Sequence, residues 1–195
     1  MLFRSFLDLG SGAGNDVFIA RRLVGNSGKV IGVDMTREMI EKANQNNNQL
    51  GFTNVEFRYG EIEQLPVEDS SIDVVISNCV LNLVPDKKKA FSEIFRVLKN
   101  GGHFCISDIV LKGKLPVGMK EAVEMYAGCV AGALQYHEYM DIIHECGFVN
   151  PEVKKEKKIE IPNLVLLNYI SIEELEDFKK SGNEIISITV FAEKS

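Results

Sequence analysis

The chain has 195 residues, of which 45% are hydrophobic and 26% are charged, as is typical of a globular fold with a sizeable core. It carries 22 Lys and Arg against 28 Asp and Glu, so the formal net charge is −6. This acidic balance argues against a nucleic-acid-binding protein and against a polybasic protein of the membrane surface.

Short apolar runs alternate along the chain with longer segments of helical spacing. In chain order, the pattern predicts a strand at 6–9, a helix at 17–23, a strand at 29–34, a helix at 36–50, strands at 54–59 and 72–77, a helix at 86–98 and a strand at 104–107. Two successive helices, 120–133 and 136–146, are followed by the last strands, 152–160 and 185–192. This order predicts an α/β fold with a mostly parallel sheet, helices on both faces, and an antiparallel, hairpin-like pair of strands at its end.

A glycine-rich loop joins the first predicted strand to the first helix. Gly10, Gly12 and Gly14 allow the backbone to turn sharply and to approach a ligand closely, and the following helix offers unpaired N–H groups. The dinucleotide fingerprint has its third glycine where this chain has Asn15, and no Gly-Lys-Ser/Thr follows as in a P-loop. The loop therefore favours a ligand other than NAD.

An acidic residue ends the second predicted strand. Asp34 lies 24 residues after Gly10, a position from which a carboxylate can accept hydrogen bonds from ribose hydroxyls. Alternatively, Asp34 only supports the start of the next helix, for which Thr36 is a suitable N-cap. Because the acid and the glycine loop occur together, we favour ribose binding.

Asp34 and three segments, 7–16, 60–66 and 97–102, together resemble the motifs of class I S-adenosylmethionine-dependent methyltransferases. The resemblance covers residues 5–108. It implies a Rossmann-like fold with a seven-stranded, mostly parallel sheet, and S-adenosyl-L-methionine as the cofactor. It also implies a single methyltransferase domain, 1–195, in which residues 1–110 bind the cofactor and residues 111–195 supply the substrate-side helices and the closing strands.

The same resemblance assigns roles to individual residues. The glycine loop would contact the methionine and ribose parts of the cofactor, Asp34 would bind the ribose and Met35 would pack on the adenine. Glu61 and Ile62 match the pair beside the adenine edge. The cofactor-binding residues that we expect are Asp8, Gly10, Gly12, Gly14, Asp16, Asp34, Met35, Glu61, Ile62 and Asn78.

Two cysteine-containing segments, 76–83 and 126–133, resemble those of arsenite methyltransferases, as do residues 14–16, 107–110 and 186–190. This resemblance implies that Cys79 and Cys129 are the As(III) ligands and that the role is arsenic detoxification. Soft thiolates hold a soft, thiophilic centre well. Thiol-bound As(III) keeps a lone pair that can attack a sulfonium methyl in line, so no general base is needed. The expected partners are arsenite, as such or as a thiol conjugate, and a thiol reductant.

The remaining cysteines and histidines favour structural positions. We expect Cys105 and Cys146 to be small buried side chains, and His137 and His144 to lie on the surface. The four cysteines contain no Cys-x-x-Cys pair, so we expect neither a zinc site nor a disulfide framework. No apolar run reaches the roughly eighteen residues of a membrane span and no signal peptide is recognisable, so we expect a cytoplasmic protein.

Two alternatives remain open. One is a carbon methyltransferase of the quinone-biosynthesis type, for which Cys79 would be dispensable. The other is a protein that binds arsenite or the cofactor without turnover. Arsenite methyltransferases usually have a segment with a further cysteine before the glycine loop, whereas here only residues 1–6 precede Leu7. We therefore expect a more open cofactor pocket and weaker cofactor binding.

Overall fold

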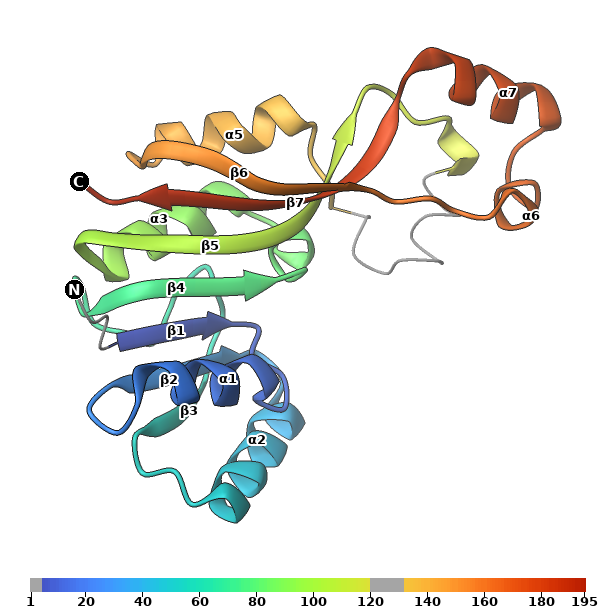
Figure 1. Ribbon diagram of the computed structural model, residues 1–195. Coiled ribbons are helices and arrows are strands. Elements are labelled where there is room, and N and C mark those ends of the chain that lie inside the picture. Colours follow the sequence, from blue (N-terminus) through green and yellow to red (C-terminus); the bar gives the residue numbers. More distant parts are fainter. Residues whose placement is uncertain (1–4, 120–131) are drawn as a thin grey trace.

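The computed structural model describes residues 5–119 and 132–195 (Figure 1). The predicted helix 120–133 therefore lies almost entirely outside the described residues. Seven strands form one sheet in the order β3-β2-β1-β4-β5-β7-β6. Their bounds are β1 Ser5–Leu9, β2 Lys29–Asp34, β3 Val55–Tyr59, β4 Ile72–Asn78, β5 Leu98–Lys112, β6 Val149–Lys158 and β7 Glu184–Glu193.

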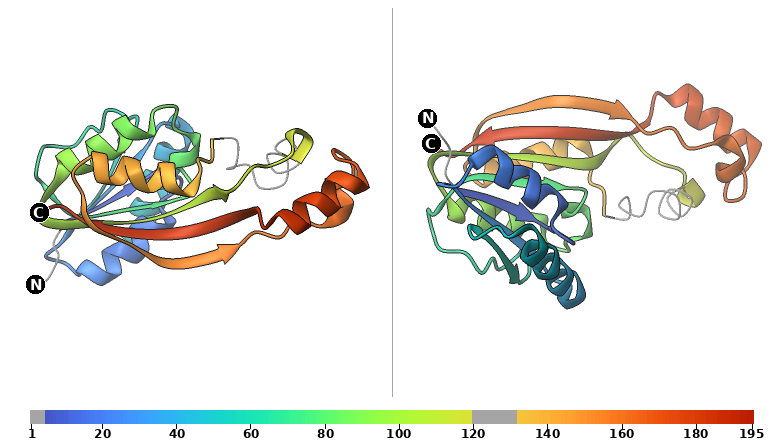
Figure 2. Two further views of the ribbon diagram at one scale, coloured as in Figure 1. Left: turned by 90° about the horizontal axis from the view of Figure 1, so that it is seen from above. Right: turned by 60° about the horizontal axis from the view of Figure 1, so that its bottom comes forward.

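The sheet is parallel from β3 to β5 and antiparallel where β7 joins β5 and β6. The helices around it are α1 Asn15–Val24, α2 Arg37–Leu50, α3 Lys87–Val97 and α5 Tyr136–Glu145, and a short 3-10 helix, η1, spans Leu81–Leu83. The predicted α/β class with a mostly parallel, seven-stranded sheet is confirmed. In Figure 2, α1 and α2 lie on one side of the sheet, and α3 and α5 lie on the other.

Each face of the sheet has its own core, because successive side chains of a strand point to opposite faces. Leu7 and Leu9 of β1 belong to the larger core with α3 and α5. Phe6, which precedes Leu7 and points to the opposite face, packs into the smaller core with α1 and α2. Asp8 occupies the same face of β1 as Phe6, so it is directed toward the α1 side.

The strand predicted at 104–107 is much longer in the structure. β5 begins at Leu98, directly after α3, and runs to Lys112. It pairs with β7 over ten positions, from His103 opposite Glu193 to Lys112 opposite Glu184. The local pattern predicts only its middle part, because Asn100, Gly101 and Gly102 precede the apolar run and the buried polar residue Asp108 interrupts it.

The far ends of β5, β6 and β7 carry a lobe that the sequence pattern did not predict. It contains α6 Asn163–Leu166 and α7 Ile172–Ser181, which follow β6 and precede β7 in the chain (Figure 1). The expected hairpin-like pair is therefore antiparallel as predicted but is not joined by a tight turn. The lobe has a separate core, which consists of Ile109, Leu111, Met119, Leu166, Ile170, Leu175 and Ile185.

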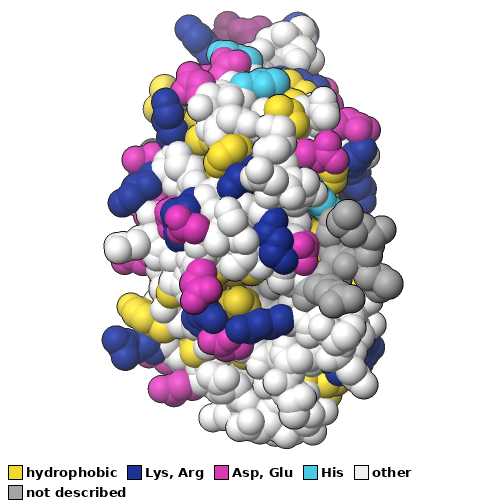
Figure 3. Space-filling view, turned by 90° about the vertical axis from the view of Figure 1, so that its left-hand side faces the viewer, with side chains coloured by type: hydrophobic (Ala, Val, Ile, Leu, Met, Phe, Trp, Pro, Cys, Tyr) yellow, Lys and Arg dark blue, Asp and Glu magenta, His cyan; other side chains and the backbone are white. Residues whose placement is uncertain are grey.

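Within the described parts of the chain, no helix is both long enough and apolar enough to cross a membrane. Figure 3 shows the side where the parallel strands begin, and acidic and basic side chains are interspersed on it. Lys99 and Asp73 form an ion pair at these amino ends of the strands, with 2.9 Å between Nζ and Oδ1.

Candidate functional site

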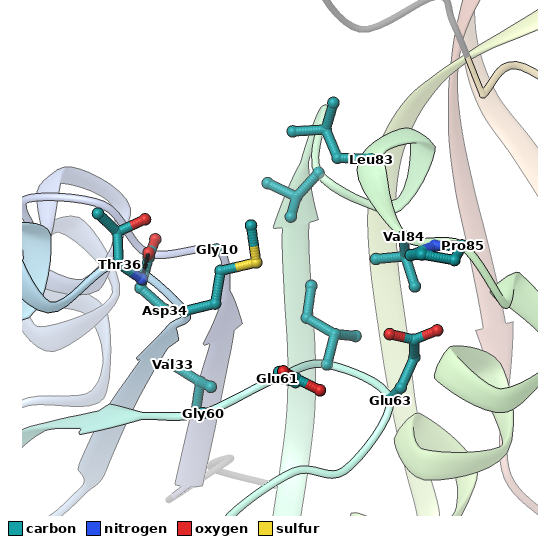
Figure 4. A pocket seen from close by; sticks show the side chains of 13 residues that line it. Gly10, Val33, Asp34, Thr36, Gly60, Glu61, Glu63, Leu83, Val84 and Pro85 are labelled. Atoms are coloured by element: carbon teal, nitrogen blue, oxygen red, sulfur yellow. Dashed lines mark hydrogen bonds between the residues drawn. The ribbon is translucent and has the colours of Figure 1, made fainter.

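A cavity of about 500 Å³ opens where the parallel strands β1, β2 and β4 end. This edge, outside the carboxyl ends of the strands, is where open α/β sheets bind ligands. The cavity is lined by Gly10, Val33, Asp34, Met35, Thr36, Gly60, Glu61, Ile62, Glu63, Val80, Leu83, Val84 and Pro85. In Figure 4, Asp34 and Thr36 stand on one side, Leu83, Val84 and Pro85 stand on the other with Glu63 below them, and Glu61 lies between the two sides.

The glycine loop is held tightly against its surroundings. The amides of Gly10 and Ser11 donate to the carbonyl of Val33, at 2.8 and 3.0 Å. A Cβ on Gly10 would lie 2.4 Å from a methyl of Val80, and the φ of Gly10 is +67°. Only glycine meets both conditions, because a side chain there would be strained as well as crowded. The loop backbone can therefore form part of the cavity wall.

Asp34 connects the glycine loop to the start of α2. One carboxylate oxygen accepts from the amide of Gly12 at 2.9 Å, and the other accepts from the amide of Thr36 at 2.8 Å. Thr36 stands at the N-cap position, but its own side chain makes no capping hydrogen bond. Asp34 thus supports the helix start and also lines the cavity. Each of its oxygens retains a lone pair for a ligand.

The charged groups of the cavity wall are acidic. Asp34, Glu61 and Glu63 line it, and none of the described lining residues is Lys, Arg or His. Glu63 also accepts a hydrogen bond from the amide of Asp86 at 2.9 Å. Such a wall favours a ligand that carries positive charge next to hydroxyl groups.

Behind the loop, Asp8 adds a buried acid. It is 4% exposed and does not line the cavity. Burial, together with the nearby negative charges of Asp16 and Asp34, raises its pKa to about 8. Gly12, Gly14 and Asp16 likewise adjoin the lining without forming part of it. A cation in the cavity would stabilise the ionised form of this group.

Cys79 lies immediately beyond β4, next to the cavity wall. Its φ is +57°, its amide donates to the carbonyl of Ser107 at 2.8 Å, and its side chain is half-buried. The next residue, Val80, lines the cavity and contacts Gly10. Asn78 ends β4 with an exposed side chain and does not line the cavity. Cys129 lies outside the described residues.

Of the ten residues expected to bind a cofactor, five line the cavity: Gly10, Asp34, Met35, Glu61 and Ile62. The segment 76–83 was singled out for Cys79, but the role of Val80, Leu83, Val84 and Pro85, in the turn after β4, as one wall of the cavity was not predicted. The apolar composition of this turn, directly after a buried strand, is the signal that could have found it.

A buried polar cluster under that turn was also missed as a unit. Asp108 is completely buried and accepts a hydrogen bond from the hydroxyl of Tyr139 at 3.2 Å. Burial raises the pKa of Asp108 to about 7, while Tyr139 and Lys87 oppose the shift. Asn82 in η1 donates from its side-chain amide to the carbonyl of Ile109 at 2.8 Å. The hydrogen bond from Asn82 holds η1, which follows Cys79, against β5, and the one from Tyr139 holds α5 there.

The other candidate ligands lie apart from the cavity. Cys105 is half-buried rather than fully buried, and burial raises the pKa of its thiol. Cys146 packs against the larger core, as expected of a structural cysteine. His137 and His144 are exposed. Among the residues that the structure describes, no group of three or more His, Cys, Asp or Glu could hold a metal ion.

Comparison with known proteins places this geometry among the methyltransferases. A methyltransferase-domain family matches residues 4–147. The arsenite methyltransferase of Halobacterium salinarum is 42% identical over 189 residues, covering 96% of this chain and 46% of that protein. The demethylmenaquinone methyltransferase of Lactococcus lactis is 41% identical over 123 residues, covering 63% of this chain and 48% of that protein.

A solved structure agrees over nearly the whole chain. It is that of an arsenic(III) S-adenosylmethionine methyltransferase from Chlamydomonas reinhardtii, with a TM-score of 0.80 and 36% identity over 98% of this chain and 64% of that one. The chain spans about half the length of the curated relatives named above. Since the family match covers most of the chain, the chain belongs to the methyltransferase-domain family.

Proposed function

We propose that the chain transfers a methyl group from S-adenosylmethionine to thiol-bound arsenite. The observation that carries the proposal is the position of Cys79 one residue from the wall of an acidic cavity that the glycine loop and Asp34 build. The relatives named as arsenite methyltransferases support the choice of acceptor.

The residues of the cavity fit the proposed cofactor. S-adenosylmethionine carries a sulfonium, an ammonium group and ribose hydroxyls, and an acidic wall favours such a molecule. Asp34 would accept from the ribose, and the loop backbone at Gly10 would face the methionine part. The exposed side chain of Met35 would cover the adenine, with Glu61 and Ile62 at its edge. Asp8, Gly12, Gly14 and Asp16 would act from behind the loop, and Asn78 from the end of β4.

On the acceptor side, Cys79 and Cys129 would hold As(III) through their thiolates. The bound cofactor supplies an electrophilic methyl group on a positively charged sulfur. The arsenic lone pair would form the new C–As bond as the methyl–sulfur bond breaks, which would leave a neutral thioether and raise arsenic formally to As(V). The protein's contribution is alignment and the exclusion of water. A thiol reductant would then return arsenic to As(III) for a further cycle.

The proposal extends to the organisation of the chain. Residues 1–110 would form the half that binds the cofactor, and residues 111–195 the half that closes the acceptor side, within one methyltransferase domain. A reducing compartment such as the cytoplasm would keep the thiols available, consistent with a role in arsenic detoxification.

Arsenic speciation after incubation with arsenite, glutathione and S-adenosylmethionine tests the proposal. We expect methylated arsenic from the wild-type chain and at least a hundredfold less from Cys79→Ser and Cys129→Ser. The matched control is Cys146→Ser, because Cys146 lies near Ser92 at the end of α5, away from the cavity lining. Arsenite binding without any methylated product would leave a binding protein instead of an enzyme.

The carbon methyltransferase is the second candidate, and the relative from Lactococcus lactis favours it. It predicts that a quinol precursor is methylated and that Cys79→Ser retains full turnover. Offering both acceptors in one assay separates the two functions.

A further inference from the structure

We propose that Glu93 and Arg96 of α3 are positioning residues for the cofactor, because they hold the loop 60–67 whose first four residues line the cavity. The inference rests on the proposed function, in which this cavity binds S-adenosylmethionine. Neither side chain lines the cavity, so both act through the backbone of the loop.

The two side chains form a bidentate ion pair that hydrogen-bonds to the backbone of the loop. The guanidinium of Arg96 donates to both carboxylate oxygens of Glu93, each at 2.7 Å. It also donates to the carbonyls of Val67 and Leu65, at 2.9 and 3.1 Å. Glu93 accepts from the amide of Leu65 at 2.8 Å. Both backbone polar groups of Leu65 are thus bound by one ion pair.

The pair is more protected than an ordinary surface salt bridge. The side chains of Arg96 and Glu93 are 29% and 17% exposed. Their mutual hydrogen bonds lower the pKa of Glu93 and raise that of Arg96, so both stay charged near neutral pH. Charge-assisted bonds of this kind are stronger than neutral ones, and removing the donor leaves two carbonyls without their partner.

The loop is tied elsewhere to the opposite walls of the cavity. The amide of Gly60 donates to the carbonyl of Asp34 at 3.1 Å, at the β2 wall. Glu63 accepts from the amide of Asp86, next to Pro85 of the opposite wall. At the end of the loop, Arg58 donates to the carbonyl of Pro66, and the pair on α3 binds Leu65 and Val67. Without the pair, this end would keep only the hydrogen bond from Arg58 among these side-chain ties.

Equilibrium binding of S-adenosylmethionine and S-adenosylhomocysteine, with steady-state kinetics, tests the inference. We expect Arg96→Met and Glu93→Gln to raise both dissociation constants about tenfold, with Arg96→Lys intermediate. The kcat at saturating cofactor should stay within about twofold of wild type, because neither residue faces the acceptor. The amides of 60–67 should exchange hydrogen faster in Arg96→Met, while those of β1 and β4 do not change.

The matched control is Lys99→Met, which breaks the ion pair with Asp73 at the opposite edge of the sheet; those side chains are 42% and 21% exposed. This variant should bind both compounds like wild type, even if it melts at a lower temperature. Arg96→Met with a lower melting temperature but wild-type dissociation constants would show that the pair is only structural, and would overturn the inference. If Arg96→Met does not fold, the same comparison of dissociation constants and melting temperature is made with Glu93→Gln. A wild-type chain that binds neither compound would instead refute the proposed function.

Discussion

Asp8 shows how a single carboxyl group couples the fold to pH. Its pKa of about 8 lies far above its usual value of 3.8, so the folded chain keeps a proton that the unfolded chain releases. Between these two values the unfolded state binds fewer protons. The free energy of unfolding therefore falls as the pH rises from about 4 to about 8.

Asp8→Asn should remove much of this pH dependence. We expect the variant to gain about 1–3 kcal/mol relative to wild type between pH 5 and pH 8.5, since asparagine stays neutral throughout. Urea unfolding at both pH values measures this. The raised pKa of Asp108, about 7, also makes the free energy of unfolding fall as the pH rises. This second contribution should remain in Asp8→Asn. An unchanged pH slope in Asp8→Asn would contradict the burial of an acid at this position.

Cys79 combines a strained backbone with a proposed chemical role. A φ of +57° suits glycine and costs a residue with a side chain about 1 kcal/mol. Cys79→Gly should therefore be more stable than Cys79→Ala by about 1 kcal/mol in chemical unfolding, although both should lose arsenite binding. Equal stability of the two variants would show that a side chain at position 79 does not strain the backbone of this turn.

At the scale of elements, the glycine loop and the turn after β4 are fitted to each other. Gly10→Ala would place a methyl group against Val80, which we expect to lower the free energy of unfolding by about 2 kcal/mol. Val80→Ala should recover part of this loss in the double variant. Thermal unfolding of the two single variants and the double variant measures the coupling, and strictly additive effects would contradict the contact.

The sequence pattern predicted the elements whose signals are local. Strand β2 was predicted at its observed bounds, and α2 was predicted to within one residue because Gly51 ends it with a positive φ. Helix α7 was missed although Ser171 and Glu174 form a capping box, a signal that was present in the sequence. The length of β5 depends on its pairing with β7, which is remote in the chain. No local pattern contains that information.

At the scale of the whole molecule, the parts of the site that lie close together in the sequence could be predicted. The glycine loop and Asp34 were found from spacing, and the structure joins them by a hydrogen bond. The cluster of Asp108 and Tyr139 was not found, because its members are distant in sequence and meet only when α5 packs on β5. The same holds for the pair on α3 that grips the 60–67 loop.

A single-turnover reaction with deuteromethyl-labelled S-adenosylmethionine tests whether the chain transfers the methyl group of the cofactor to arsenic. Arsenite, glutathione and the labelled cofactor are mixed with an excess of the wild-type chain, and the products are separated by chromatography and weighed by mass spectrometry. We expect one labelled methyl group on arsenic for each S-adenosylhomocysteine formed. Unlabelled arsenic beside consumed cofactor, or cofactor that is bound and never consumed, would contradict this expectation.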